Sequence, residues 1–272
     1  MSIKSQITEK LLLLVLDGCR YDTAVEQMGI LNHHVDYKQA QLIKVHAEMP
    51  SSSRPLYEVL ATGVPSYRNG ILTNADGQHS KELSIFDLVK AAGGSTAAAA
   101  HYWQSELFNQ APYEIKRDRI QHDHKKSIQH GIFYSENQYP DSHVFADGHY
   151  LLHTYQPNLL LIHSMNIDAA GHRYTAVSKE YRKAVNQADQ LIGLYLHDWL
   201  AAGYQVIVTA DHGMDEYGLH GGSMAAHREV PLYIFSDIFP PDCGIEKMNQ
   251  LELAPLICSL LKIDTSERMQ IG

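Results

Sequence analysis

The amino-acid sequence predicts an α/β fold with a mostly parallel central sheet and helices on both faces. Three runs, Leu11–Leu16, Asn158–His163 and Tyr204–Thr209, are almost continuously apolar, as expected of parallel strands that are buried on both faces. Segments with helical periodicity lie between the predicted strands, and this alternation is typical of a parallel sheet covered on both sides. Acidic and histidine residues follow these strands closely. They would lie at the carboxyl ends of the strands, where sites form in open α/β sheets.

The elements of the first hundred residues follow from the apolar runs and from the residues that end them. Leu56, Val59 and Leu60 are spaced as the buried stripe of a helix, which Thr62 and Gly63 end. The expected elements are a strand at Leu11–Leu16, a helix from near Tyr21 to just before Gly29, a strand at Gln41–Ala47, a helix between Pro55 and Thr62, a helix at Ser84–Ala92 and a strand at Thr96–Tyr102.

Residues 103–140 differ from the rest, because they are polar, rich in Tyr, His and Gln, and without clear periodicity. We therefore expect an excursion over about 103–150 that covers a site and does not belong to the core. Without an internal repeat or a disordered linker, residues 1–272 are expected to form a single domain. The remaining expected elements are a helix at Phe145–Tyr155, a strand at Asn158–His163, a helix at Lys179–Ala202, a strand at Tyr204–Thr209, a strand at Pro231–Phe235 and a closing helix at Leu251–Leu261.

Composition excludes several classes of protein. The formal net charge of −9 and the lack of a long Lys/Arg run argue against a nucleic-acid-binding surface. The three cysteines, Cys19, Cys243 and Cys258, show no Cys-x-x-Cys spacing, which argues against a disulfide framework or a structural zinc knuckle. The run Leu11–Leu16 is too short for a signal-peptide core or for a membrane span. We expect a soluble, cytoplasmic protein without a membrane segment; the sequence indicates no oligomeric state.

The residues after the strand Tyr204–Thr209 are the first candidates for a functional site. Asp211 and His212 place a carboxylate and an imidazole side by side at the end of this strand, and Gly213 lets the chain turn away. Oxygen and nitrogen ligands of this kind suit a divalent metal such as zinc or manganese. The alternative is a strand-end turn with a surface histidine.

Other polar residues extend this candidate metal site. Asp17 is either a ligand or an ordinary residue of a strand-to-helix turn. Asp168 and His172 can converge on one ion, unless they belong to a glycine-containing loop without that role. His220 and His227 compete for the last ligand position, and one of them is expected to lie beside a ligand.

A hydroxyl nucleophile is available in the triplet Ser51, Ser52 and Ser53. The triplet lies after a predicted strand and before a predicted helix, so one serine is expected to cap the helix. Another serine can lie on a metal at the helix N-terminus, where the helix dipole favours an alkoxide and a bound phosphate. Arg54 beside the triplet is expected to bind an anionic substrate.

The ordered set of motifs resembles the alkaline phosphatase superfamily, and most of all its nucleotide pyrophosphatase/phosphodiesterase branch. The residues 50–55 with the following Thr62-Gly63 resemble the nucleophile turn of that branch, and residues 168–172 match it as well. Residues 211–222 also resemble the GPI ethanolamine phosphate transferases, and residues 250–255 are similar to a closing segment of sulfatases. The resemblance spans nearly the whole chain and implies an alkaline phosphatase-like core.

This resemblance implies a dinuclear, metal-dependent phosphodiesterase with Ser53 as the nucleophile and a small-molecule phosphate ester as the substrate. The family's phosphate-holding Asn is replaced here by Leu56, so either Arg54 or a residue of 101–150 makes that contact, or the substrate preference differs from that of the family. Two divalent ions, zinc or else manganese, are implied, one at Asp17, Ser53, Asp211 and His212, the other at Asp168, His172 and His220, with His227 as the alternative to His220.

Other activities of the superfamily stay open as alternatives, namely a phosphomutase, a phosphomonoesterase or a sulfatase-like hydrolase. A sulfatase is disfavoured because the nucleophile turn has no cysteine to be converted to formylglycine. A non-catalytic binding relative would predict a damaged ligand set, whereas the hydroxyl and all the Asp and His positions are present.

Overall fold

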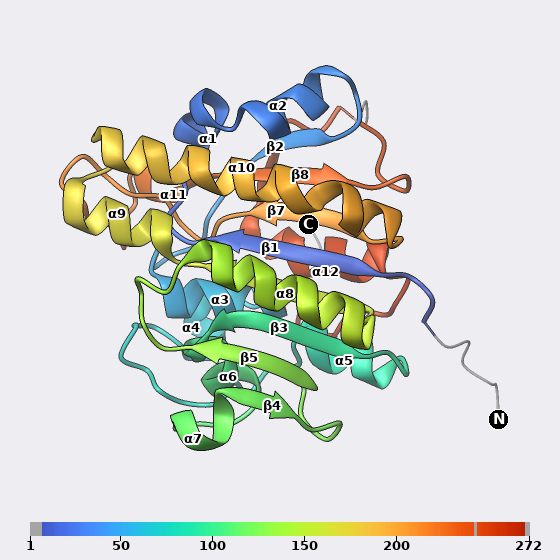
Figure 1. Ribbon diagram of the computed structural model, residues 1–272. Helices are drawn as coiled ribbons and strands as arrows, with labels where there is room; N and C mark the ends of the chain where they lie inside the picture. Colours follow the sequence, from blue (N-terminus) through green and yellow to red (C-terminus); the bar gives the residue numbers. More distant parts are fainter. Residues whose placement is uncertain (1–6, 242–243, 270–272) are drawn as a thin grey trace.

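The computed structural model describes residues 7–241 and 244–269, and Cys243 therefore lies outside the described residues. Its strands form one sheet in the order β4-β5-β3-β6-β1-β7-β8-β2-β9 (Figure 1). The strands are β1 (Leu11–Leu16), β2 (Gln41–His46), β3 (Thr96–His101), β4 (Ile120–His122), β5 (His130–Tyr134), β6 (Leu159–Ser164), β7 (Gln205–Thr209), β8 (Glu229–Phe235) and β9 (Lys247–Asn249).

The predicted fold class is confirmed. Strands β5, β3, β6, β1 and β7 are parallel neighbours, and of the described strands only β4 and β8 run against the others. All six residues of β1 and of β6 are buried, which explains why these strands are continuously apolar and not alternating.

Helices cover both faces of the sheet (Figure 1). On one face α8 packs on β3 and β6, while α10 packs on β7; on the other face α3, α5 and α12 contact one another. The helices are α1 (Tyr21–Gln27), α2 (Gly29–Asp36), α3 (Ser53–Thr62), α4 (Ser66–Asn69), α5 (Ile85–Ala91), α6 (Tyr102–Phe108), α7 (Ile115–Asp118), α8 (Asp141–Tyr155), α9 (Asn166–Tyr174), α10 (Lys179–Ala201), α11 (Ala225–Arg228) and α12 (Leu253–Leu260), and a 3-10 turn covers Gln250–Glu252.

The register of the central strands brings their carboxyl ends to one edge of the sheet. Val15 of β1 lies opposite His163 of β6 on one side and opposite Thr209 of β7 on the other. Asp17 and Asp211 follow directly beyond this row. The strand ends that are followed by candidate site residues therefore meet at the centre of one edge of the sheet.

The segment 103–150 differs from the expected excursion. Strand β5, which is buried along its whole length, pairs in parallel with β3, and helix α8 already begins at Asp141. Much of this segment therefore belongs to the sheet and to its cover. Helix α9 was also not expected, and it carries both Asp168 and His172 on its first and last turns. Within residues 7–241 and 244–269, no helix has the length and apolarity that a membrane span requires.

Candidate metal centre

The three serines of the triplet have different surroundings. The Ser53 hydroxyl is buried and lies 3.1 Å from Nε2 of His212, whereas the Ser51 hydroxyl donates to the carbonyl of Gly222 at 2.7 Å. Ser52 is the N-cap residue of α3, yet its side chain makes no capping hydrogen bond, contrary to the expectation that one serine caps. Of the three hydroxyls, that of Ser53 is therefore the one with a contact to a candidate metal ligand.

Helix α3 begins at Ser53, and Pro55 follows in its first turn. Proline is tolerated at this end because the first N–H groups of a helix have no partner within the helix. The nucleophile candidate thus lies at the positive end of a helix dipole, where backbone N–H groups favour an anion.

Three buried carboxylates converge beside Ser53. Asp17, Asp168 and Asp211 are each at most 3% exposed. One oxygen of each, Oδ1 of Asp17, Oδ1 of Asp168 and Oδ2 of Asp211, has no hydrogen-bond partner. Buried polar atoms without partners are rare and costly in native proteins. Three such oxygens in one cluster indicate a site built to receive a cation.

Three histidines direct lone pairs into the same cluster. The Nδ1 atoms of His212, His172 and His220 lie 2.9, 2.8 and 3.0 Å from backbone carbonyl oxygens, to which they must donate their proton. In the neutral form of such a ring, Nε2 is unprotonated and keeps its lone pair. Metal-binding histidines show this arrangement, in which the second ring nitrogen donates to a carbonyl or carboxylate.

The Nε2 atoms lie close to the unpartnered carboxylate oxygens. His212 Nε2 is 3.6 Å from Asp17 Oδ1 and 3.3 Å from Asp211 Oδ2, and His172 Nε2 is 3.3 Å from Asp168 Oδ1 and 3.2 Å from His220 Nε2. The candidate ligand atoms of Asp168, His172 and His220 lie within 4.8 Å of one another, as do those of Asp17, Asp168 and His212. Asp168 therefore links two neighbouring groups of ligand atoms.

Burial sets the charge state of these groups. It lowers the pKa of His212 and of His220 to about 3, so both rings are neutral at neutral pH. Burial, and next the charge of a neighbouring carboxylate, raises the pKa of Asp17 and of Asp168 well above their usual range. No Lys or Arg within the described part of the chain pairs with these carboxylates or with Asp211. The cluster therefore lacks the positive charge that a divalent cation would bring.

His227 has a different hydrogen-bonding pattern. Its Nδ1 accepts the backbone N–H of Gly222 at 3.0 Å, which leaves Nε2 to donate to Asp215 at 3.1 Å. Neither nitrogen has a free lone pair, so of the two competing histidines it is His220 that the structure brings to the cluster. His227 supports the loop that carries His220.

Arg54 does not lie as the sequence led us to expect. Its side chain is buried, pairs with Glu106 at 2.7 Å and donates to the carbonyl of Asp76 at 3.0 Å, and it stacks over the ring of Trp103. Both terminal nitrogens of the guanidinium are committed to these partners, whereas the buried Nε has none, so the structure favours a packing role for Arg54 and its substrate contact stays a prediction. Arg54 links α6 and the loop 72–77 to the start of α3 through these contacts.

We expect Glu106→Ala to lower the free energy of unfolding by about 3–5 kcal/mol, because it leaves the Arg54 charge buried and unpaired. Glu229→Ala is the matched control, since the Lys44–Glu229 pair has a similar length of 2.8 Å but is partly exposed. That change should cost at most about 1 kcal/mol. Urea unfolding of both variants measures the difference, and equal losses would contradict the structural role of Arg54.

Three residues beside the cluster were not found from the sequence. Asn74 accepts the backbone N–H of Arg54 at 3.0 Å, which places its side-chain amide at the N-terminus of α3 next to Ser53. Tyr57 and His163 both contact Oδ2 of Asp17. The only signal for His163 in the sequence was a polar residue at the end of an otherwise apolar strand.

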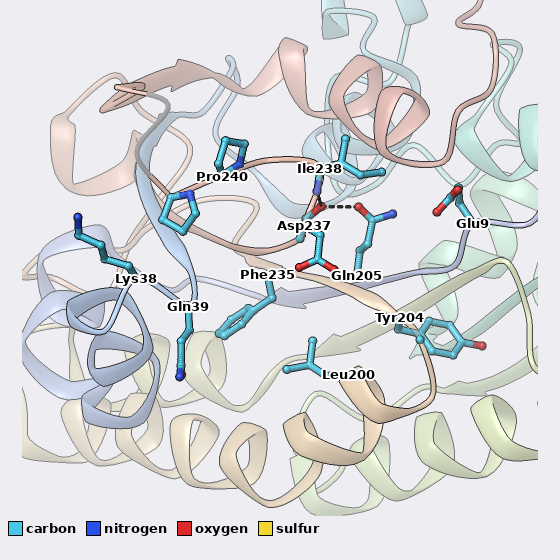
Figure 2. A pocket seen from close by; sticks show the side chains of 13 residues that line it. Glu9, Lys38, Gln39, Leu200, Tyr204, Gln205, Phe235, Asp237, Ile238 and Pro240 are labelled. Atoms are coloured by element: carbon cyan, nitrogen blue, oxygen red, sulfur yellow. Dashed lines mark hydrogen bonds between the residues drawn. The ribbon is translucent and has the colours of Figure 1, made fainter.

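A separate cavity of about 660 Å³ lies at the opposite edge of the sheet, where β7 begins and β8 ends. Figure 2 shows Gln205, Phe235 and Asp237 among the residues that line it. None of the predicted site residues lines this cavity. Although this cavity is large, it is therefore not the candidate functional site.

A mostly parallel sheet with an Asp/His/Ser cluster at the carboxyl ends of its central strands is the arrangement expected of the alkaline phosphatase superfamily. The sequence model of the type I phosphodiesterase / nucleotide pyrophosphatase family matches residues 11–225. The chain belongs to this family.

Curated relatives and solved structures agree with this assignment. GPI ethanolamine phosphate transferase 3 of Schizosaccharomyces pombe is 23% identical over 94% of this chain, and GPI ethanolamine phosphate transferase 2 of Eremothecium gossypii is 23% identical over 84% of it. The chain spans only 28% of the length of each of these relatives. Murine ectonucleotide pyrophosphatase/phosphodiesterase 5 shares the fold, with a TM-score of 0.77 at 14% identity over 95% of this chain and 96% of that one.

Proposed function

We propose that the protein is a metal-dependent phosphodiesterase that uses Ser53 as its nucleophile. The observation that carries this proposal is the Ser53 hydroxyl, 3.1 Å from His212 Nε2 and beside carboxylate oxygens that have no partner. A reactive hydroxyl, neutral histidines and unpaired carboxylates at one helix N-terminus fit phosphoryl transfer better than any purely structural role.

Two divalent ions, zinc or manganese, fit this donor set. Asp17, Ser53, Asp211 and His212 would hold one ion, and Asp168, His172 and His220 the other. When bound, the ions would neutralise phosphate oxygens and favour ionisation of the Ser53 hydroxyl. The His172 side chain is 45% exposed, so the cluster is open to a substrate on this side.

The residues of the chain have defined parts in the proposed reaction. The Ser53 Oγ attacks phosphorus, the bond to the leaving alcohol breaks, the serine proton leaves with that alcohol, and Ser53 keeps the phosphoryl group with its remaining ester substituent. Water then cleaves the ester bond to Ser53, and Oγ regains a proton. The Ser53 N–H at the start of α3 and the side-chain NH2 of Asn74, whose Oδ1 already accepts the Arg54 N–H, would donate hydrogen bonds to a phosphate oxygen, a contact that was expected of Arg54 or of a residue of 101–150.

Transfer of the phosphoryl group to an alcohol instead of water is the second candidate reaction. The names of the curated relatives describe phosphate transferases, and the first half of the reaction is the same for both outcomes. A transferase would keep the substituted phosphoryl group on Ser53 and pass it on quickly only when an acceptor alcohol is added, which yields a new diester and free Ser53.

The test of the proposed function is turnover of bis-p-nitrophenyl phosphate and of p-nitrophenyl phosphate with zinc or manganese added. We expect the diester to be cleaved faster and a chelator to stop the reaction. Faster cleavage of the monoester would favour a phosphomonoesterase. If neither ester is cleaved, with or without an acceptor alcohol, the proposed phosphodiesterase activity is wrong.

Gly18 offers a second test, because it lets the turn after β1 approach α9 closely. Gly18 has a φ of +74°, and an added Cβ would lie 2.9 Å from Asp168 Cα. We expect Gly18→Ala to displace Asp168 and to reduce diester turnover at least about 10-fold.

Gly203→Ala is the control for this prediction. Gly203 has a similar φ of +84°, but an added Cβ would meet no atom within 4 Å. Both variants should lose about 1–2 kcal/mol of stability to the left-handed backbone, while only the Gly18 variant loses turnover. Equal diester turnover in the two variants would show that catalysis does not depend on the position of Asp168.

A further inference from the structure

We propose that Tyr57 and His163 are positioning residues that hold Asp17 so that only its Oδ1 atom can reach a metal ion. The inference rests on the proposed function, because it assigns to these residues an effect on metal binding. Both residues are buried, at most 1% exposed, and neither belongs to the expected ligand set.

Both side chains bind the same oxygen of Asp17. The Tyr57 hydroxyl donates to Oδ2, and His163 Nε2 lies 3.2 Å from that atom. The backbone N–H of His101 donates to His163 Nδ1 at 3.4 Å. A neutral ring that accepts at Nδ1 carries its proton on Nε2, so His163 donates to Oδ2 as well.

This arrangement divides the two oxygens of Asp17 between different tasks. Oδ2 has two donors, whereas Oδ1 has no hydrogen-bond partner and lies 3.6 Å from Nε2 of His212. The two donors fix the plane of the carboxylate and occupy the oxygen that a bidentate contact would need. Monodentate contact through Oδ1 suits a small ion, whereas calcium with its larger number of oxygen ligands often takes both oxygens of a carboxylate.

The donors also connect the metal ligand to the nucleophile. Tyr57 lies four residues after Ser53 on α3, so the two side chains share one face of the helix. His163 is itself held in place, because its backbone carbonyl accepts the hydroxyl of Tyr134 at 2.7 Å and its ring packs edge-on against that of Tyr57, with the ring centroids 4.7 Å apart. One rigid helix therefore sets both the attacking hydroxyl and the orientation of Asp17.

The test uses Tyr57→Phe, His163→Leu and His163→Gln in the full chain. The first two remove one donor each, while the glutamine amide can still donate to Oδ2. Tyr204→Phe is the matched control, since it removes a buried hydroxyl that donates to the carbonyl of Pro157 at 2.8 Å, far from Asp17. Zinc affinity is measured by chelator competition, calcium affinity by titration, and folding by thermal unfolding of the metal-free protein.

We expect Tyr57→Phe and His163→Leu to weaken zinc binding about 10- to 100-fold and to narrow the preference for zinc over calcium. The His163→Gln and Tyr204→Phe variants should stay within a few-fold of wild type. Excess zinc should restore kcat in Tyr57→Phe, which a collapsed site would not allow.

Two outcomes would overturn the inference. If all variants bind zinc as the wild type does, or if His163→Gln is as weak as His163→Leu, the residues do not position Asp17. These results would leave the proposed function intact. If the wild type binds no divalent metal at all, the proposed function fails and this inference fails with it.

Discussion

Replacing Ser53 by alanine is expected to reduce turnover of bis-p-nitrophenyl phosphate by about 10³-fold or more, because the attacking oxygen is lost. The bound metal should stay, since Asp17, Asp211 and His212 are unchanged. The expected loss is larger than for any positioning residue, because no neighbouring group can substitute for the nucleophile. Circular dichroism and metal analysis of the variant check that the fold and the cluster remain.

Ser52→Ala is the matched control for the nucleophile. Ser52 is adjacent in the sequence, yet its hydroxyl makes no capping hydrogen bond to α3. Its loss should change turnover by only a few-fold. If Ser52→Ala is inactive while Ser53→Ala keeps substantial turnover, the assignment of the nucleophile is wrong.

The second large effect is expected at the end of β7. Asp211→Asn and His212→Ala should each abolish activity and lower the metal content without unfolding the protein. Asp211→Asn removes the negative charge at Oδ2, an atom that has no other partner, while the Gly18 N–H that binds Oδ1 at 3.2 Å can keep its acceptor. His212→Ala removes the Nε2 atom that lies between Ser53, Asp17 and Asp211.

The competing histidines provide the comparison for this prediction. We expect His220→Ala to lose metal, and His227→Gln to retain it, because of these two histidines only His220 has a free Nε2 in the cluster. Metal analysis of the four purified variants measures this. If His227→Gln loses metal while His220→Ala keeps it, the ligand set that we propose is incorrect.

Local sequence patterns were sufficient to predict the central strands of the sheet. Strands β1, β6 and β7 are long apolar runs because each is buried on both faces, and the chain shows this without knowledge of the neighbours. Strand β5 was missed because it is short and contains His130 and Gly131. Its burial depends on pairing with β3, which lies well before it in the sequence, and on cover from the following helix α8. The expected cytoplasmic location stays a prediction.

The residues of the candidate site likewise divide into those that the sequence predicted and those that it did not. Asp17, Asp168 and Asp211 follow directly from strand order, because the carboxyl ends of parallel strands meet at one edge. The buried ion pair of Arg54 could not be predicted, since its partner Glu106 lies 52 residues away on a helix that the sequence did not predict. His163 was likewise missed, because its contact with Asp17 joins residues 146 positions apart.

The most direct test of a two-metal phosphodiesterase is a titration of the metal-depleted protein with zinc or manganese, followed by metal content and diester turnover together. We predict that turnover is absent without metal, rises with added metal and reaches its maximum at about two ions per chain. Full turnover by the metal-depleted protein would contradict the proposed mechanism.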